Sequence, residues 1–167
     1  MTVFRINSAL LTGLDVQRIG VEVDVRRGLP NFTIVGLAQD AVRESRDRVI
    51  AAIKNAGFEM PAMKVTVNLT PVSLRKASSL LDLPMAVGVL AASKQIPPPP
   101  DQAVFLGEVS LDGTLRSAPG ILALLDGIKD STVIVVPEPN LPEAAILRSI
   151  HRRSARILGL EHLSGLA

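Results

Sequence analysis

Apolar and polar side chains alternate with a period of two over residues 3–37, a pattern typical of β-strands with one face exposed to solvent. In "VQRIGVEVDVRRG", Ile19, Val21 and Val23 fall on one face, and Arg18 and Glu22 fall on the other. Glycine and proline separate this run from "VFRINSALL" before it and from "NFTIVGL" after it. We therefore expect three strands in an antiparallel meander with one face exposed to solvent.

The period then changes to that of a helix. In "AQDAVRESRDRVIAAIKNAG", Val42, Val49 and Ile53 recur at helical spacing and Gly57 supplies a stop, so we expect an amphipathic helix over residues 39–56. Glu44 stands four residues before Arg48, a spacing that favours an ion pair on the helix surface. A strand over 63–71 and a helix over 79–94 follow, and the prolines of "QIPPPP" predict an extended exposed loop.

Shorter elements occupy the last third of the chain. The turn signal "LDG" between two alternating runs predicts a hairpin over 103–118. A helix within 119–131, a buried strand over 132–137, a helix over 141–151 and a strand over 155–160 complete the order. This succession predicts an α/β (α+β) fold with mixed strand pairing, in a single domain over residues 1–167 without internal repeats.

Composition excludes several classes of function. The chain has no cysteine, which rules out thiol chemistry, and its lack of tyrosine and tryptophan disfavours a module that stacks single-stranded bases. Two histidines are too few to suggest a metal site. Neither a P-loop nor a dinucleotide glycine pattern occurs, and no apolar run is long enough to span a membrane. We expect a cytoplasmic protein with no catalytic, cofactor or metal site in this chain.

Basic residues are nearly balanced by acidic ones, 18 against 16, so the surface as a whole is not built around phosphate. The densest basic spots are "VRRG", the "RK" at 75–76 and "HRR" at 151–153. Solvated turns explain each of them, and contact with phosphate or an acidic partner is the alternative. The DNA-contacting hypothesis uses Arg26, Arg27, Arg43, Arg75, Lys76, Arg152 and Arg153.

Two serines begin the helix predicted over 79–94, in "KASSLLDLPMAVGVL". Ser78 and Ser79 stand where a helix N-cap is expected, and Asp82 follows in the first turn, where an acid favours the helix dipole. A serine nucleophile would need a base within hydrogen-bond reach, and Lys76 or Asp82 is the nearest candidate along the chain. Capping is the simpler interpretation, and catalysis by Ser79 is the alternative.

Six motifs in order carry a family resemblance: "GLPNFTIVGL", "AVRESRDRVIAAIKNAGF", "VTVNLTPVSLRK", "LDLPMAVGVLAAS", "FLGEVSLDGTLR" and "VIVVPEPN". Together they resemble the amino-terminal domain of the magnesium-chelatase-like AAA+ ATPases of the ComM/YifB family. The resemblance covers residues 1 to 166. It implies a fold like that of the Lon proteolytic domain and of the second domain of ribosomal protein S5.

The resemblance also bears on the serine question. In Lon-type proteases, a serine at the start of one helix works with a lysine of a later helix, and the matching positions here are Leu80 and Leu122. Ser79 is one residue away, roughly 100° around a helix axis, and Lys129 is about two turns too late. The segment also has Ala77 and Ser78 where the family commonly has Glu and Gly. The resemblance therefore implies a non-catalytic domain.

What the resemblance implies for function lies partly outside this chain. An ATPase module that binds ATP and Mg²⁺ would follow in the same parent chain, which would form a hexamer acting on DNA in natural transformation and branch migration. Three hypotheses stay open for the domain itself. It assembles or positions partners, it contacts DNA through its basic residues, or it is a divergent Lon-like serine peptidase using Ser79.

Overall fold

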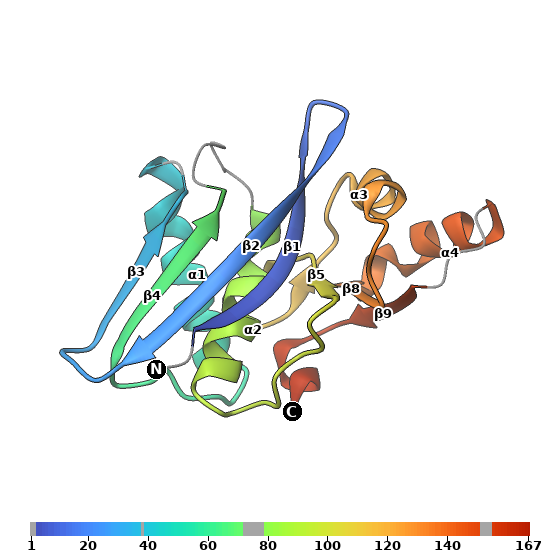
Figure 1. The fold of residues 1–167 in the computed structure, drawn as a ribbon. Helices are drawn as coiled ribbons and strands as arrows, with labels where there is room; N and C mark the ends of the chain where they lie inside the picture. The colour runs from blue at the N-terminus through green and yellow to red at the C-terminus, as the bar shows by residue number, and fades with distance from the viewer. Residues whose placement is uncertain (1–2, 38, 72–78, 151–154) are drawn as a thin grey trace.

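The longest stretch of alternating residues forms a hairpin. In the computed structural model, which describes residues 3–37, 39–71, 79–150 and 155–167, β1 (Phe4–Thr12) pairs antiparallel with β2 (Asp15–Arg26). Figure 1 shows the tip of this hairpin extending beyond the rest of the sheet. The antiparallel pair and its alternating burial confirm the first part of the expected meander.

The third strand does not continue the meander. β3 (Asn31–Val35) lies at the edge of the sheet, and β4 (Lys64–Thr70) lies between β3 and β2. β4 is parallel to β3 and antiparallel to β2, so the expected order of the three strands is wrong. The reason is α1 (Gln39–Asn55), because a helical crossover returns the chain beside and parallel to the strand it left.

Three parallel strands extend the sheet on the other side of β1. β5 (Ala103–Phe105), β8 (Val133–Pro137) and β9 (Arg156–Leu160) complete the order β3-β4-β2-β1-β5-β8-β9. β5 is buried throughout, with Ala103 and Phe105 in one apolar cluster and Val104 in the other. Burial on both faces is what a central parallel strand requires. The α/β fold with mixed pairing is thus confirmed.

The predicted hairpin over 103–118 is smaller than expected. Only β6 (Glu108–Val109) and β7 (Leu115–Arg116) pair as a separate two-stranded sheet, since β5 belongs to the large sheet. The turn between them lies at the predicted "LDG", and Gly113 there has a positive φ of 95°. The turn signal is therefore right, and the length of the first strand is wrong.

Helices cover the two faces of the sheet in different places (Figure 1). α1 and α2 (Asp82–Ala92) lie against β1–β4 and enclose the larger apolar cluster. α3 (Ile121–Gly127) and α4 (Leu141–Ile150) cover the opposite face beside β5 and β8, around the smaller cluster. Close approach of α2 depends on Gly88, where an added Cβ would come within 2.5 Å of Val23 Cγ2. No helix in the described ranges combines the length and apolarity that a membrane span requires.

Helix boundaries follow the sequence pattern with local differences. α1 matches the helix expected over 39–56, whereas the helix expected over 79–94 is a 3₁₀ turn, η1 (Ser79–Leu81), followed by α2. α3 ends at Gly127, so Lys129 lies outside the helix in which the sequence placed it. Two further 3₁₀ turns are η2 (Glu138–Asn140) and η3 (Leu163–Leu166). The proline segment after α2 forms neither helix nor strand and is largely exposed, in keeping with the expected loop.

Candidate functional site

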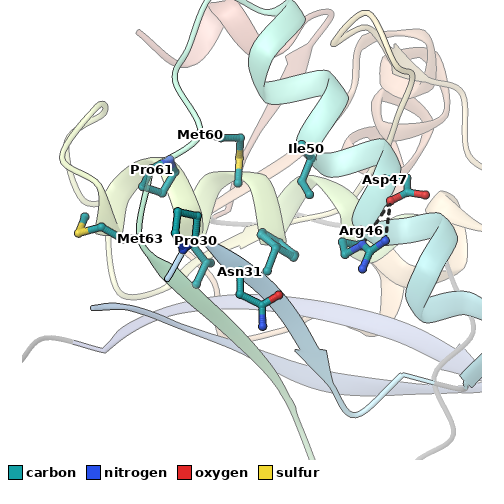
Figure 2. Close-up of a pocket in the computed structure, with 10 residues that line it drawn as sticks. Pro30, Asn31, Arg46, Asp47, Ile50, Met60, Pro61 and Met63 are labelled. Atoms are coloured by element: carbon teal, nitrogen blue, oxygen red, sulfur yellow. Dashed lines mark hydrogen bonds and ion pairs between the residues drawn. The ribbon is translucent and has the colours of Figure 1, made fainter. Parts of the chain in front are cut away.

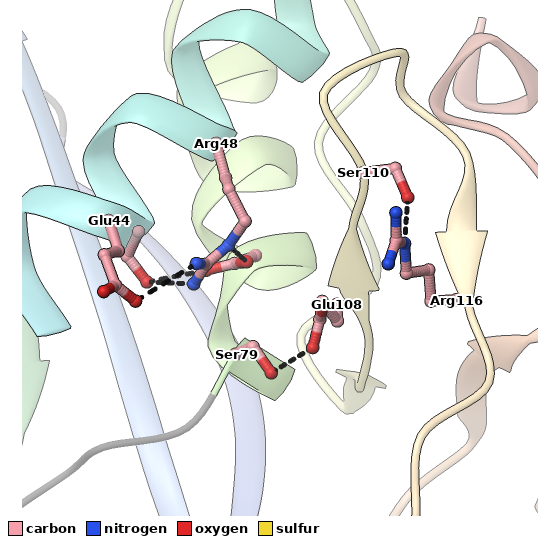
Figure 3. A network of polar contacts seen from close by, with 8 residues as sticks. Glu44, Arg48, Ser79, Glu108, Ser110 and Arg116 are labelled. Carbon is pink, nitrogen blue, oxygen red and sulfur yellow. Dashed lines mark hydrogen bonds and ion pairs between the residues drawn. The ribbon is translucent and has the colours of Figure 1, made fainter.

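The start of α2 holds the polar residues that the sequence singled out. Ser79 opens η1, and its hydroxyl donates to Oε2 of Glu108 on β6 (Figure 3). The N-cap of α2 is Leu81, without a side-chain cap, so the expectation that Ser79 caps this helix is wrong. The 3₁₀ turn explains the difference, because it places Ser79 three residues before α2 begins. Ser78 lies outside the described residues.

Asp82 is the centre of a buried polar cluster at the junction of α1 and α2. Its side chain is fully buried, and it accepts from the Ser45 hydroxyl at Oδ1 and from Arg48 Nε at Oδ2, each at 2.7 Å. Arg48 Nη2 also donates to the Ser45 hydroxyl oxygen at 3.3 Å. Glu44 lies 3.7 Å from Arg48 Nη1 on the solvent side, as the i,i+4 spacing predicted. We call Ser45, Arg48 and Asp82 the α1–α2 polar cluster.

Burial dominates the electrostatics of this cluster. Removal from water raises the pKa of Asp82 to about 6, while the hydrogen bonds from Arg48 and Ser45 oppose that rise. The negative charge of Glu108 adds to the rise. For Arg48, the hydrogen bond to Asp82 raises the pKa of the guanidinium. Because both carboxylate oxygens of Asp82 have partners inside the protein, the arrangement is that of a structural ion pair rather than of an open acid–base centre.

The two leucines at the Lon-like positions occupy different surroundings. Leu80 in η1 is half-buried and packs against both apolar clusters. Leu122 on α3 is 39% exposed. Lys129, the lysine closest in sequence to the expected partner, is exposed beyond the end of α3. The polar group that meets the Ser79 hydroxyl is thus a carboxylate, Glu108.

Three basic residues of the DNA-contacting hypothesis lie in the described part of the chain, and these three do not gather in one place. Arg26 ends β2 and pairs with Asp24, and Arg27 is exposed in the turn that follows. Arg43 is exposed near the start of α1, at the opposite end of β3 from that turn. The other four lie outside the described residues: Arg75, Lys76, Arg152 and Arg153.

A cavity of about 340 Å³ lies between β3 and α1, and nothing in the sequence pattern predicted it. Figure 2 shows Ile50 and Met60 pointing toward it and the Arg46–Asp47 ion pair, at 3.2 Å, on one side. Two methionines, Met60 and Met63, contribute to its lining. Among the described residues, no group of three or more His, Asp or Glu side chains could hold a metal ion.

Comparison with known proteins assigns the chain to a family. Residues 21–140 match the family described as subunit ChlI of Mg-chelatase. The chain is 40% identical over 162 residues to an uncharacterized protein of Mycobacterium tuberculosis (strain H37Rv), a match that covers 95% of this chain and 32% of that protein. The chain therefore belongs to the ChlI family.

Two further relatives, YifB and ComM, are similar to this chain at nearly the same identity. YifB of Escherichia coli (strain K12), also described as uncharacterized, is 39% identical over 149 residues, which is 88% of this chain and 29% of YifB. Competence protein ComM of Haemophilus influenzae is 38% identical over 137 residues, 81% of this chain and 27% of ComM. The resemblance to ComM and YifB is thus confirmed, and the chain spans about a third of the length of these relatives.

Proposed function

We propose that this chain is a non-catalytic accessory domain of a longer AAA+ ATPase of the ComM type and that its role is assembly. The ATPase module of the same parent chain would bind ATP and Mg²⁺, since this chain has no P-loop sequence. Matches that cover only about a third of each relative support a place within a longer protein. The parent would act as a cytoplasmic hexamer in DNA processing, in natural transformation and branch migration.

The observation that carries the assembly role is an apolar surface at the tip of the β1–β2 hairpin. Leu14 in the turn is fully exposed, and Leu11 is 38% exposed. An added Cβ at Gly120, just before α3, would lie 3.0 Å from Leu11 Cδ1, so Leu11 lies beside the start of α3. Two exposed leucines on a hairpin that projects from the sheet are the apolar groups that another protein module would cover.

The geometry around Ser79 supports a role without catalysis. Activation of a serine requires a base that can remove its proton, and a lysine is that base in the Lon-type arrangement. Here the hydroxyl donates to Glu108, and Leu80 and Leu122 occupy the two positions that the resemblance assigns to the reacting groups. Among the described residues, the Lon-type pair of a serine and a lysine therefore has no counterpart at Ser79.

The assembly role can be tested on the hairpin tip in the full-length parent chain. Leu14→Asp would place a charge on the proposed docking surface, and we expect it to lower the hexameric fraction at least several-fold in mass photometry. Leu29→Asp is the matched control, because Leu29 is 88% exposed in the β2–β3 turn at the other end of the sheet. Equal assembly of the two variants and the wild type would contradict the proposal.

A further inference from the structure

The face of the sheet over β1–β4 that α1 and α2 leave uncovered meets a helix only near the β1–β2 hairpin, where α3 packs against β1 and β2, as at Gly127 and Val16 (Figure 1). Strand register determines which residues share that face, because directly paired residues point to the same side. Arg5 pairs with Glu22 and Glu22 with Asn68, while Arg26 pairs with Lys64. The alternate residues of the same strands, such as Val21 and Val67, lie in the apolar cluster under α1 and α2. We call the uncovered side the open sheet face.

Basic and neutral hydrogen-bonding side chains dominate the open sheet face. Four of its residues are cationic, and all four are exposed: Arg5, Arg18, Arg26 and Lys64. Between them the register places threonines and asparagines: Asn7, Asn31, Thr33, Thr66, Asn68 and Thr70. Arg18 and Arg26 both lie on β2, and the usual rise per residue of a strand puts them about 26 Å apart.

Two carboxylates, Glu22 and Asp24, lie on this face among its four cations. Asp24 is 8% exposed and pairs with Arg26, and Glu22 accepts a hydrogen bond from the Asn68 amide at 2.8 Å. Arg5 lies flat over Gly20, where an added Cβ would be 3.1 Å from its Nε and Nη2. Among the ion pairs that the described residues form, none uses Arg5 or Lys64. The outward charge of the face is therefore positive.

We propose that the open sheet face binds the phosphodiester backbone of a nucleic acid. Arginine, lysine, threonine and asparagine side chains are the groups that proteins use on phosphate and sugar, and they contact several phosphates when spread over this length. A protein partner fits less well, because a protein interface has an apolar centre and the exposed apolar residues that the register places here, Leu11 and Val35, lie at the margins of the face. The face carries no aromatic ring, so binding follows the backbone and not the bases.

This inference goes beyond the proposed assembly role and does not depend on it. Among the three described residues of the sequence-based DNA hypothesis, Arg26 is the one that belongs to the open sheet face. The hairpin tip with Leu14 is a separate surface. Loss of nucleic-acid binding can therefore be measured on the 167-residue chain without any effect on assembly of the parent.

The test is fluorescence anisotropy with a labelled single-stranded DNA of about 20 nucleotides and a duplex of equal length, over about 50–200 mM salt. Four phosphate contacts predict a slope of log affinity against log salt of about −3 for the single strand. Arg5→Ser/Arg18→Ser/Lys64→Ser should weaken binding at least tenfold at the lowest salt and flatten the slope by about two. Glu22→Gln should tighten binding about two- to threefold, because it removes a negative charge from the face.

The matched control removes three exposed positive charges elsewhere, in Lys54→Ser/Lys129→Ser/Arg156→Ser. We expect this control to stay within about twofold of the wild type, with both triple variants checked for folding by circular dichroism. Three results would overturn the proposal: no DNA binding at the lowest salt, equal weakening by the two triple variants, or binding of poly-glutamate in preference to DNA. The last result would identify an acidic polypeptide as the partner.

Discussion

Arg48 on α1 donates through Nε to Oδ2 of Asp82 at 2.7 Å, across 34 residues of sequence. This contact fixes α1 against the first turn of α2, in a position where the carboxylate is shielded from water. A buried carboxylate is costly unless it is paired, so the pair and Ser45 together determine how the two helices meet.

Stability should depend on pH through Asp82. Its pKa is about 6 in the folded protein against an ordinary 3.8, so the folded state holds a proton that the unfolded chain has released. This proton stabilises the folded state fully below about pH 4. As pH rises through about 6 the proton is lost, and the free energy of unfolding falls by about 3 kcal/mol. Urea unfolding between about pH 4 and 7 should show this loss in the wild type and not in Asp82→Asn. A difference between the two proteins that stays constant with pH would refute the assignment.

Removal of Arg48 should be far more costly than removal of its other acidic neighbour. Arg48→Ala leaves the buried carboxylate of Asp82 without its cation, and we expect a loss of about 3 kcal/mol at neutral pH. Glu44→Ala is the matched control, since Glu44 is 76% exposed and 3.7 Å away, and it should cost less than about 0.5 kcal/mol. Denaturant midpoints measure both, and equal losses would show that the surface pair matters as much as the buried one.

Asn140 should prove to be a structural residue of the "VIVVPEPN" motif. Its fully buried amide accepts from the N–H of Ala118 and donates to the carbonyl of the same residue, each at 3.0 Å. Asn140→Ala would leave two buried backbone groups unpaired, which we expect to cost about 2–4 kcal/mol. Asn31→Ala, at an exposed site, should change the free energy of unfolding by less than about 0.5 kcal/mol. A small loss for Asn140→Ala would mean that water replaces the amide.

The chain should show no peptide hydrolysis that depends on Ser79. We expect Ser79→Ala to match the wild type in a fluorogenic-peptide assay, at background rates, because leucines occupy the two positions of the Lon-type serine and lysine. Glu108→Gln is a useful companion, since it keeps the shape of the acceptor and removes its charge. Hydrolysis above background that Ser79→Ala abolishes would restore the peptidase hypothesis.

Periodicity was sufficient to predict the elements with strong patterns. α1 and the β1–β2 hairpin follow from alternation and helical spacing, because each of them buries one continuous apolar side. The position of β3 did not follow, since an edge strand and a central strand can share the same local pattern. Only the crossover through α1 distinguishes them.

The site was less predictable than the fold for a related reason. Asp82 was visible in "LDLP" as a first-turn acid, but its partners Ser45 and Arg48 lie on another helix, and their own spacing indicates only an ordinary helix surface. Arg5, Arg18 and Lys64 were likewise invisible as a group, because they stand singly in three strands and strand pairing brings them to one face. Of the basic pairs that stand together in sequence, the one within the described residues is Arg26 and Arg27, at the end of β2 and in the turn after it.

The most direct test of the central claim is to delete residues 1–167 from the full-length parent and to measure its particle mass and ATPase rate. A non-catalytic assembly domain predicts loss of the hexamer, with a monomeric module that still binds ATP. A truncated protein that assembles and hydrolyses ATP like the intact parent would contradict the account.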